Sequence, residues 1–338
     1  MVYVLILNWN EWGDTIECLE SVFRSDYPNY RVVVCDNGSQ NASLEYIAAW
    51  AEGRLDALVA PTHPLRSLTF PPVPKPLPVA RLECATAEAG GPDGAATARL
   101  VLISVGQNRG YAGGNNVGLR YALARNDFSY VWLLNPDTVV APDALSKMVA
   151  EMDAVSSAGL CGSTILLYDN PGRVQALGGA TFYKWLAVTP PIGGSQPVTQ
   201  PIAADRVRAQ LAMILGASAL VSKRFLHEVG LMSEDYFLFF EEMDWATRAR
   251  NRYTLAYAPE SRVYHRQGHS TGLGVSFRTR SVLAEHHMAR SRLLFTRKYY
   301  PRARITVSLT LLAIALCRIL LGQWAQAKAV LDVVVRRP

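Results

Sequence analysis

The alternation of short apolar runs with helix-like segments is the feature that most restricts how this chain can fold. Runs rich in valine, isoleucine and leucine occupy residues 2–7, 31–35, 100–105 and 130–134. Segments of helical character follow at residues 14–24, 43–52 and 115–125, and after Pro142-Asp143. Strands that alternate with helices in this way pair in parallel, so the sequence predicts an α/β fold with a doubly wound sheet.

Residues 54–99 interrupt this rhythm with a proline-rich stretch. Seven prolines between residues 61 and 78 are followed by alanine- and glycine-rich sequence around Gly90-Gly91-Pro92. Because proline cannot donate a ladder hydrogen bond, we expect a surface insertion that lacks sheet pairing. The alternative is a docking site for proline-reading modules, although an inert loop is the more common case for such segments.

Charge divides the chain into a body and a tail. Residues 1–277 hold 22 Lys and Arg against 26 Asp and Glu, whereas residues 278–338 hold 12 against 2. A mildly acidic body argues against a nucleic-acid enzyme, whose basic footprint would lie beside its chemistry. We therefore expect a body that carries the chemistry over residues 1–277 and a basic helical tail over residues 278–338.

The tail also contains an apolar stretch over residues 305–316, which lies between Arg304 and Arg318. This stretch is shorter than the roughly 20 residues that a spanning helix needs. Apolar residues flanked by cations are typical of helices that lie on an anionic membrane surface. We expect such a peripheral contact, and a merely solubilising tail is the alternative.

The cysteines and the N-terminal residues favour a cytoplasmic protein. Five cysteines are widely spaced and contain no CxxC pair, so neither a disulfide framework nor a zinc site is indicated. Met1 runs directly into the first apolar run, without a basic segment or a small-residue cleavage site. With the basic tail, this predicts a protein at the inner face of the plasma membrane.

Polar residues and glycines follow each of the four predicted strands. They are Asn8 and Asn10, Asp36 and Asn37, Asn108 with Gly110, Gly113, Gly114 and Asn116, and Asn135. Any one of them is more often a turn or a helix cap. Together they meet at the sheet edge where ligands of open parallel sheets bind. Asn and Asp can read a base and ribose hydroxyls, and glycines let backbone amides approach a diphosphate, so we expect a nucleotide site.

Asp137 follows the fourth predicted strand closely and is the strongest candidate for a metal ligand. One carboxylate together with phosphate oxygens suits Mg²⁺ or Mn²⁺, which would offset the charge of a departing diphosphate. The alternative is a helix cap, since Pro142 lies downstream.

A second acidic group follows a run of aromatic residues at 236–240. Glu241, Glu242 and Asp244 stand directly behind these rings. Acidic residues also favour the first turn of a helix, which is the structural alternative. Three acids behind bulky aromatics are more typical of a substrate cleft, where a carboxylate can act as a general base.

These motifs together resemble the family 2 inverting glycosyltransferases, in particular the rhamnosyltransferase-like members. The resemblance covers roughly residues 2–300 and is carried by Asn8-Trp9-Asn10, Asp36-Asn37-Gly38-Ser39, residues 108–116, Asn135-Pro136-Asp137 and Glu241-Glu242-Met243-Asp244. It implies a GT-A fold and a nucleotide-sugar donor, either dTDP-rhamnose or a UDP-hexose. It also implies transfer to a hydroxyl of a glycan or lipid-linked acceptor.

The resemblance assigns roles to individual residues. It places the metal at Asp137, the last residue of what is usually a DxD-like motif, although the first position here is Asn135. The family's base lies in a Glu-Asp motif that matches Glu241-Glu242, with Asp244 or Glu241 as a substitute for Glu242. Relatives place a histidine on the metal or the diphosphate, which favours His265 over His269. The pair His286-His287 lies in a basic helix and is predicted to be non-catalytic.

Three competing functions remain to be compared with this one. A nucleotidyltransferase would need a glycine-rich, arginine-containing loop after the first strand, where this chain has Asn8-Trp9-Asn10-Glu11. A processive polysaccharide synthase would carry a QxxRW-type motif and several spanning helices. A membrane-associated scaffold with a dead transferase domain is the non-enzymatic alternative, and the presence of Asp137 and Glu242 argues against it.

Overall fold

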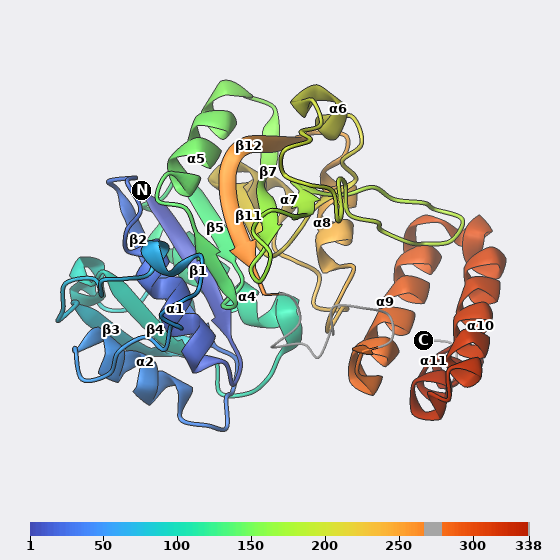
Figure 1. Ribbon diagram of the computed structural model, residues 1–338, viewed down its shortest axis with the longest axis horizontal. Helices are drawn as coiled ribbons and strands as arrows, with labels where there is room; N and C mark the ends of the chain where they lie inside the picture. The colour runs from blue at the N-terminus through green and yellow to red at the C-terminus, as the bar shows by residue number, and fades with distance from the viewer. Residues whose placement is uncertain (267–278, 337–338) are drawn as a thin grey trace.

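A ten-stranded mixed sheet runs through the protein in the computed structural model, which describes residues 1–266 and 279–336 (Figure 1). The strand order is β3-β4-β2-β1-β5-β11-β7-β12-β6, and β8 pairs with β7. The strands from β3 to β5 are parallel to one another, whereas β11 runs antiparallel between β5 and β7. Helices cover both faces, so the predicted α/β architecture is confirmed.

The four predicted strands lie side by side in the parallel half. The elements of this half are β1 (Val2–Asn8), α1 (Trp12–Val22), β2 (Tyr30–Asp36), α2 (Ser43–Ala51), β4 (Leu100–Ser104), α4 (Gly110–Arg125), β5 (Tyr130–Leu134) and α5 (Ala144–Ala154). Their apolar residues are buried on both faces of the sheet, with Trp50 and Trp132 in one layer and Tyr121 in the other. Near-continuous apolar strands are what a sheet covered on both faces requires.

The second half of the sheet is mixed. It comprises β6 (Thr138–Val140), β7 (Ala158–Leu167), β8 (Val174–Leu177), β11 (Ser218–Ser222) and β12 (Thr254–His265), with the small pair β9 (Gly179–Ala180) and β10 (Met213–Ile214) beside it. Three further helices complete this half, namely α6 (Ala204–Arg208), α7 (Lys223–Val229) and α8 (Glu241–Ala249). Strand β12 ends at His265 and pairs with β6 on one side and β7 on the other, which brings His265 opposite Thr138.

The proline-rich insertion forms the outer edge of the sheet. It contains β3 (Val79–Glu83) and α3 (Cys84–Glu88), between the short 3₁₀ turns η1 (Arg66–Leu68) and η2 (Asp93–Thr97). Strand β3 pairs in parallel with β4, with Val79 opposite Leu100. The prediction that the insertion lacks ladder hydrogen bonds is therefore wrong for this strand. Its physical reason is local: the proline run ends at Pro78, so every residue of β3 keeps its backbone N–H.

A buried carboxylate holds the insertion against the body. Glu20 of α1 is fully buried and accepts hydrogen bonds from the backbone N–H of Val73 at 2.8 Å and from the Trp50 indole at 2.8 Å. Lys75 from the insertion forms an ion pair with the same carboxylate at 2.7 Å. An uncompensated buried charge would be costly, so the insertion stabilises the body and is itself held in place.

The C-terminal residues form three helices that continue the body. They are α9 (Val282–Tyr299), α10 (Arg304–Leu320) and α11 (Trp324–Arg336), with the turn η4 (Pro301–Ala303) between the first two. Phe295 of α9 shares a buried cluster with Phe240 and Met243 of the α8 region. The tail is helical where the structure describes it, and α9 belongs to the same core as the domain that precedes it.

We expect Gly162→Ala to lower the free energy of unfolding by about 1–3 kcal/mol, because overpacking of a rigid core has this cost. A Cβ at Gly162 in β7 would lie 2.2 Å from the backbone oxygen of Gly178. Gly13→Ala is the matched control, since nothing lies within 4 Å of its Cβ in helix α1. Urea denaturation followed by circular dichroism measures both. Equal stabilities of the two variants would contradict the close approach of β7 to Gly178.

Candidate functional site

A cavity of about 460 Å³ opens beyond the carboxyl ends of the parallel strands. Four predicted nucleotide-binding residues line it, namely Asn37, Asn108, Gly110 and Asn135. The other lining residues are Leu7, Trp9, Tyr111, Pro136, Phe237, Leu238, Ser281, Leu283 and His287. Polar groups at strand ends and aromatic or aliphatic walls are the usual composition of a pocket for a nucleotide.

Two asparagines fix the backbone at the start of α4. The side chain of Asn37 donates to Asn108 Oδ1 at 3.0 Å and to the Gly110 carbonyl at 3.1 Å. Asn37 Oδ1 in turn accepts from the backbone N–H of Arg109 at 3.0 Å, and Asn108 Oδ1 accepts from Gly110 N–H at 2.9 Å. The two side chains therefore shape the wall of the cavity through the backbone turn that they hold.

The glycines of this stretch lie inside helix α4, which starts earlier than the sequence predicts. Helix α4 already begins at Gly110, whose φ of 71° is in the left-handed region. The Gly110 N–H donates to Asn108 Oδ1, and the Tyr111 N–H donates to the Phe237 carbonyl at 2.9 Å. The Gly110 amide is therefore already paired, which does not fit the expectation that it faces a diphosphate. Gly114 instead permits close packing on β1, since a Cβ there would lie 2.5 Å from Leu7 Cδ1.

The remaining glycine and asparagine of α4 also have packing contacts. A Cβ at Gly113 would lie 2.7 Å from Arg109 Cβ. Asn116 is buried and joins α4 to the segment before α8, because its amide donates to the Met232 carbonyl at 3.0 Å and to Glu234 at 2.8 Å. Neither residue lines the cavity.

The polar residues after β1 and β2 bind one another. Asn8 Nδ2 donates to Asp36 Oδ1 at 2.6 Å, and Asp36 Oδ2 accepts from the backbone N–H of Ser39 at 3.0 Å. Asn10 adopts a φ of 60° and its side chain accepts from Gln40 N–H at 2.8 Å. These contacts fix the two loops that adjoin Trp9 and Asn37 at the cavity wall. Asn10 itself lines a neighbouring cavity of about 270 Å³.

Asp137 and His265 meet at the end of β12. His265 Nε2 lies 3.1 Å from Asp137 Oδ1, and both side chains are at least nine-tenths buried. Gln175 Oε1 of β8 lies 2.9 Å from His265 Nδ1. A carbonyl oxygen can only accept, so this contact keeps the proton on Nδ1 and turns the Nε2 lone pair towards Asp137. Asn135 Nδ2 lies 3.3 Å from the same nitrogen.

This pair fits a divalent cation by its donor chemistry. A carboxylate oxygen and an imidazole lone pair that face each other in a buried place repel unless a proton or a cation lies between them. An amide that orients the second ring nitrogen is a common support for a ligating histidine. Among the described residues, no group of three or more His, Cys, Asp and Glu side chains is placed to hold a metal. A cation held by Asp137 and His265 would thus need oxygens from a ligand such as a diphosphate.

The small segment at 216–217 connects this pair to the acidic helix. The N–H of Gly216 donates to Glu242 Oε1 at 3.2 Å, and its carbonyl accepts from the Tyr111 hydroxyl at 2.8 Å. The next carbonyl, of Ala217, accepts from the backbone N–H of Asn135 at 3.1 Å. A Cβ at Gly216 would lie 2.5 Å from Glu242 Oε1 and 2.6 Å from Tyr111 Oη. Glycine is therefore required at this junction.

Tyr111 lies beside Glu242 at the 216–217 segment. Burial raises the pKa of Tyr111 well above its ordinary value, and the negative charges of Glu242, Glu241 and Asp137 raise it further. Electrostatic effects of this kind fall off with distance. Tyr111 and Glu242 thus meet at Gly216, and Tyr111 lines the 460 Å³ cavity.

The backbone before α8 is strained in a way that fixes its first carboxylates. Phe239 and Phe240 have φ values of 68° and 70°, a region that costs of order 1–3 kcal/mol for such residues. Glu241 is 2% exposed, and burial raises the pKa of its carboxyl well above the ordinary value, with the Glu242 charge as the second cause. Its Oε2 has no hydrogen-bond partner among the described residues. Burial and the neighbouring charge thus both favour the protonated form of Glu241.

Glu242 is the more accessible of the two. Its side chain is half-buried, and burial raises the pKa of its carboxyl above the ordinary value. The hydrogen bonds from the backbone amides of Glu242 and Gly216 oppose this rise. A carboxylate with a raised pKa beside a cavity has the properties of a general base.

Asp244 has a different environment from its neighbours. It is fully buried and accepts from Arg248 Nε at 2.8 Å, Lys298 Nζ at 2.9 Å and the Tyr299 hydroxyl at 2.8 Å. Burial alone would raise the pKa of Asp244, but these three donors outweigh it and lower the pKa. A carboxylate whose charge is balanced by two cations is a poor proton acceptor. The position of Asp244 therefore indicates a structural role, in which it joins α8 to α9, and not a catalytic one.

The sequence does not predict that helix α9 contributes to the wall of the 460 Å³ cavity. His287 lines the cavity and stacks on Phe237 with ring centroids 4.6 Å apart, although the sequence predicts a non-catalytic residue. Burial lowers the pKa of His287, so its imidazole is neutral at neutral pH. Two adjacent histidines in a basic helix carry no pattern that marks one of them as part of a cavity wall. His269, the second predicted histidine, lies outside the described residues.

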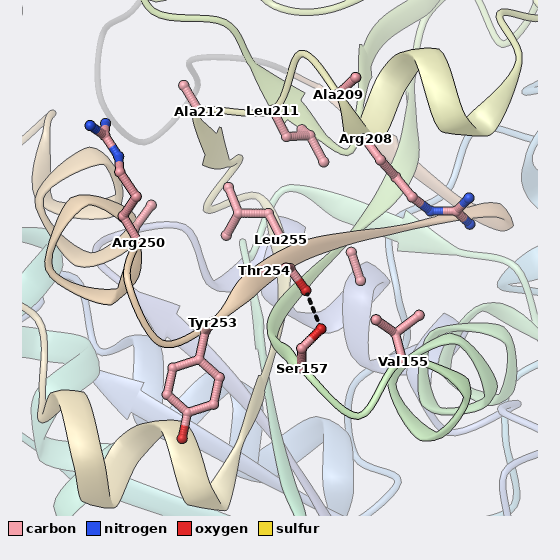
Figure 2. A pocket seen from close by; sticks show the side chains of 12 residues that line it. Val155, Ser157, Arg208, Ala209, Leu211, Ala212, Arg250, Tyr253, Thr254 and Leu255 are labelled. Atoms are coloured by element: carbon pink, nitrogen blue, oxygen red, sulfur yellow. Dashed lines mark hydrogen bonds between the residues drawn. The ribbon is translucent and has the colours of Figure 1, made fainter.

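A larger cavity of about 570 Å³ lies elsewhere, and none of the predicted site residues lines it. Figure 2 shows Arg208 and Arg250 on opposite sides of an apolar floor that includes Leu255. Arg208 is bound to Glu151 at 2.9 Å and Asp205 at 2.7 Å. Size alone therefore does not identify the functional site, and the polar strand ends meet at the smaller 460 Å³ cavity.

Comparisons with known proteins agree with this geometry. The mannosyltransferase PcManGT from Pyrobaculum calidifontis, solved in complex with GDP-Man and Mn²⁺, has a similar structure with a TM-score of 0.53 at 14% identity. The alignment covers 99% of this chain and 86% of that chain. GalNAc-T7, solved with UDP, GalNAc and Mn²⁺, is similar with a TM-score of 0.51 at 13% identity, over 86% of this chain and 47% of that chain. These similarities show that the architecture is a GT-A fold.

Sequence comparison gives the family. The low-salt glycan biosynthesis hexosyltransferase Agl10 of Haloferax volcanii is 23% identical over 148 residues, which cover 44% of this chain and 45% of that protein. The aligned region thus spans less than half of this relative. The profile of the family described as Glycosyl transferase family 2 matches residues 3–62 and 94–229, more than half of the chain. The chain therefore belongs to glycosyl transferase family 2.

Proposed function

We propose that this protein transfers a hexosyl or rhamnosyl group from a nucleoside diphosphate sugar to an acceptor hydroxyl, with inversion at the anomeric carbon. The observation that carries the proposal is that Glu242 and Asn135, two residues before Asp137, both bind the 216–217 segment, which also accepts a hydrogen bond from Tyr111 in the wall of the 460 Å³ cavity. Single-displacement transfer needs a base on one side of the sugar and stabilisation of the departing diphosphate on the other. The two carboxylates suit these two tasks.

The donor is proposed to occupy the cavity beyond the strand ends. Trp9 and Asn37 lie in its wall at the β1 and β2 loops, where a base and a ribose would bind, and Asn135 lies nearer to the Asp137 and His265 pair. The named relative is a hexosyltransferase, which supports a UDP-hexose, and the resemblance in motif order supports dTDP-rhamnose. Both donors share a pyrimidine base and a diphosphate.

Asp137 and His265 are proposed to hold Mg²⁺ or Mn²⁺. The cation would neutralise charge that develops on the diphosphate when it departs. Gln175 and Asn135 orient the imidazole for this task through contacts of 2.9 and 3.3 Å. The fold relatives solved with Mn²⁺ are consistent with this assignment.

Glu242 is proposed as the base that takes the acceptor proton. Its partial exposure lets an acceptor hydroxyl reach it, and its raised pKa makes the carboxylate a stronger proton acceptor than an ordinary glutamate. Glu241 is buried in surroundings that oppose its ionisation, and the charge of Asp244 is balanced by Lys298 and Arg248. The acceptor is proposed to be a glycan or lipid-linked glycan, used by a cytoplasmic enzyme at the inner face of the plasma membrane.

Glu242→Gln is expected to lower kcat for sugar transfer by about 10²–10⁴-fold, the usual contribution of a general base. The amide cannot take the proton but keeps the shape of the side chain. Transfer should be measured with a panel of nucleotide sugars and Mn²⁺, since the release of nucleoside diphosphate by slow donor hydrolysis shows that the donor still binds. Glu241→Gln is the matched control, with a smaller loss. Near-normal transfer by Glu242→Gln would move the base to Glu241.

The pH profile gives a second test of the same base. Burial raises the pKa of Glu242 above its ordinary value of 4.5, so the carboxylate is lost when the pH falls through this raised value. The acid limb of kcat/KM should therefore lie above pH 4.5. Glu242→Gln should remove this limb from the residual activity. An unchanged acid limb in the variant would assign the titration to another group.

Mutation of the cation ligands should weaken Mn²⁺ binding in the presence of UDP. Asp137→Ala and His265→Ala each remove a ligand, and Gln175→Leu should weaken binding by about 10–100-fold, the usual cost of losing a partner that orients a ligand. Electron paramagnetic resonance of free Mn²⁺ measures binding without any need for turnover. Asp56→Asn, which alters an exposed carboxylate of the insertion, is the control. Mn²⁺ binding that survives Asp137→Ala would exclude this site.

A further inference from the structure

Helix α10 has an apolar face that no other described element covers. Val307, Leu311 and Ala315 on its inner face are buried in a cluster with α9 and α11. Its outer face exposes Ile305, Leu309, Leu312, Leu316 and Leu320. Their spacing of three or four residues places them in one stripe along the helix. Leu309 is 59% exposed and Leu320 is 77% exposed, so both the first and the second half of the stripe are exposed.

Arg318 does not interrupt this stripe, although its place in the sequence suggests that it would. The side chain is fully buried, and its guanidinium contacts Glu285 of α9 at 2.5 Å and Gln323 at 2.5 Å. It is the only charged residue between Arg304 and Lys328. Because its charge is turned inward and paired, the outer face of α10 carries no charge after Arg304, its first residue.

The tip of a loop extends the apolar stripe beyond the start of α10. Tyr183, Trp185 and Leu186 are exposed, with Trp185 at 52%. The Thr306 hydroxyl donates to the Trp185 carbonyl at 2.6 Å, which joins this loop tip to α10. In Figure 1 the yellow-green loop after β9 reaches the red C-terminal helices. Trp324, which is 67% exposed, follows the other end of α10, so indole rings lie near both ends of the stripe.

Cations border the end of the stripe that carries the loop tip. Lys184, Arg302 and Arg304 are exposed there. A groove of about 420 Å³ opens beside it, with an apolar wall that includes Leu293, Ile305, Leu309 and Val334. Arg297 and Arg304 line the same groove. Apolar surface next to guanidinium groups is complementary to a lipid, whose acyl chain and anionic headgroup have the same juxtaposition.

We propose that the outer face of α10 and the 183–186 loop tip form a surface that binds an anionic lipid bilayer. Helix α10 lies in the plane of the interface, with its leucine stripe among the acyl chains and the indoles of Trp185 and Trp324 at headgroup level. Arg302, Arg304 and Lys184 contact the lipid phosphates. This surface would account for the location at the plasma membrane in the proposed function, and the inference rests on that location.

The contacts of α10 favour an interfacial helix over a spanning one. The helical segment Pro301–Leu320 is long and apolar enough to cross a membrane by length and composition. Crossing would separate Arg318 from Glu285 or carry this buried pair into the hydrocarbon. It would also strip the inner face from α9, which Lys298 and Ser291 attach to the body at 2.9 Å each.

Vesicle co-sedimentation of the full chain tests the proposal. Vesicles of phosphatidylcholine with phosphatidylglycerol should bind the protein, and pure phosphatidylcholine should bind it more weakly. The double variant Leu309→Gln/Leu316→Gln should lower the partition coefficient by about tenfold or more, because two leucine side chains no longer favour the apolar phase. Leu58→Gln is the matched control, since Leu58 is 74% exposed on the insertion. Binding that the double variant leaves unchanged would overturn the proposal.

Brominated acyl chains test the geometry of the surface. They should quench tryptophan fluorescence in the wild-type protein, and the quenched fraction should fall in Trp185→Phe and in Trp324→Phe. A quenched fraction that is as large in both variants as in the wild-type protein would refute the assigned face.

Analytical ultracentrifugation separates lipid from a second copy of the chain as the partner. A dimer that Leu309→Gln/Leu316→Gln dissociates, without vesicle binding by the wild-type protein, would make the face a protein interface and overturn the lipid proposal. A monomer without vesicle binding would also overturn it. Donor hydrolysis in lipid-free buffer should be equal in all these variants, so it reports on the proposed transfer activity separately.

Discussion

The buried carboxylate of Asp244 is the contact on which the arrangement of the site depends. Two cations and a hydroxyl from two helices neutralise it, and they thereby fix α8 against α9. This position of α8 sets Glu241 and Glu242 at its first turn, while that of α9 brings His287 to the cavity. A buried charge is tolerated only when its partners are complete, so the helices cannot separate without exposing or orphaning it.

Neighbouring acids in one sequence motif thus acquire different properties from their surroundings. Burial and a nearby charge oppose the ionisation of Glu241, whereas the donors around Asp244 favour its charged form. Glu242 lies between these limits, since Gly216 leaves room for its carboxylate and donates a hydrogen bond to it. Spacing along the helix cannot distinguish the three residues, because the distinction comes from α9 and from a glycine that is distant in sequence.

Much of the fold and part of the site could be predicted from the sequence. The four parallel strands are predictable because buried strands appear in the sequence as continuous apolar runs. Strand β3 is not predictable in this way, because five residues after a proline run show no clear period. The glycines at 113 and 114 suggested a phosphate loop, but the helix starts at Gly110 and buries them. The pairing of Asp137 with His265 depends on the antiparallel register of β6 and β12, which no local pattern specifies.

The proline-rich insertion has a consequence for the whole sheet. Strand β3 is short and begins directly after Pro78, two features that discourage an edge strand from pairing with another molecule. It covers β4, whose residues from Leu100 to Ile103 are all apolar and buried. A shortened protein without the insertion would present that strand to solvent with an open row of backbone donors and acceptors. Such an edge is a template for aggregation, so a segment that looks dispensable in the sequence protects the sheet from pairing with other molecules.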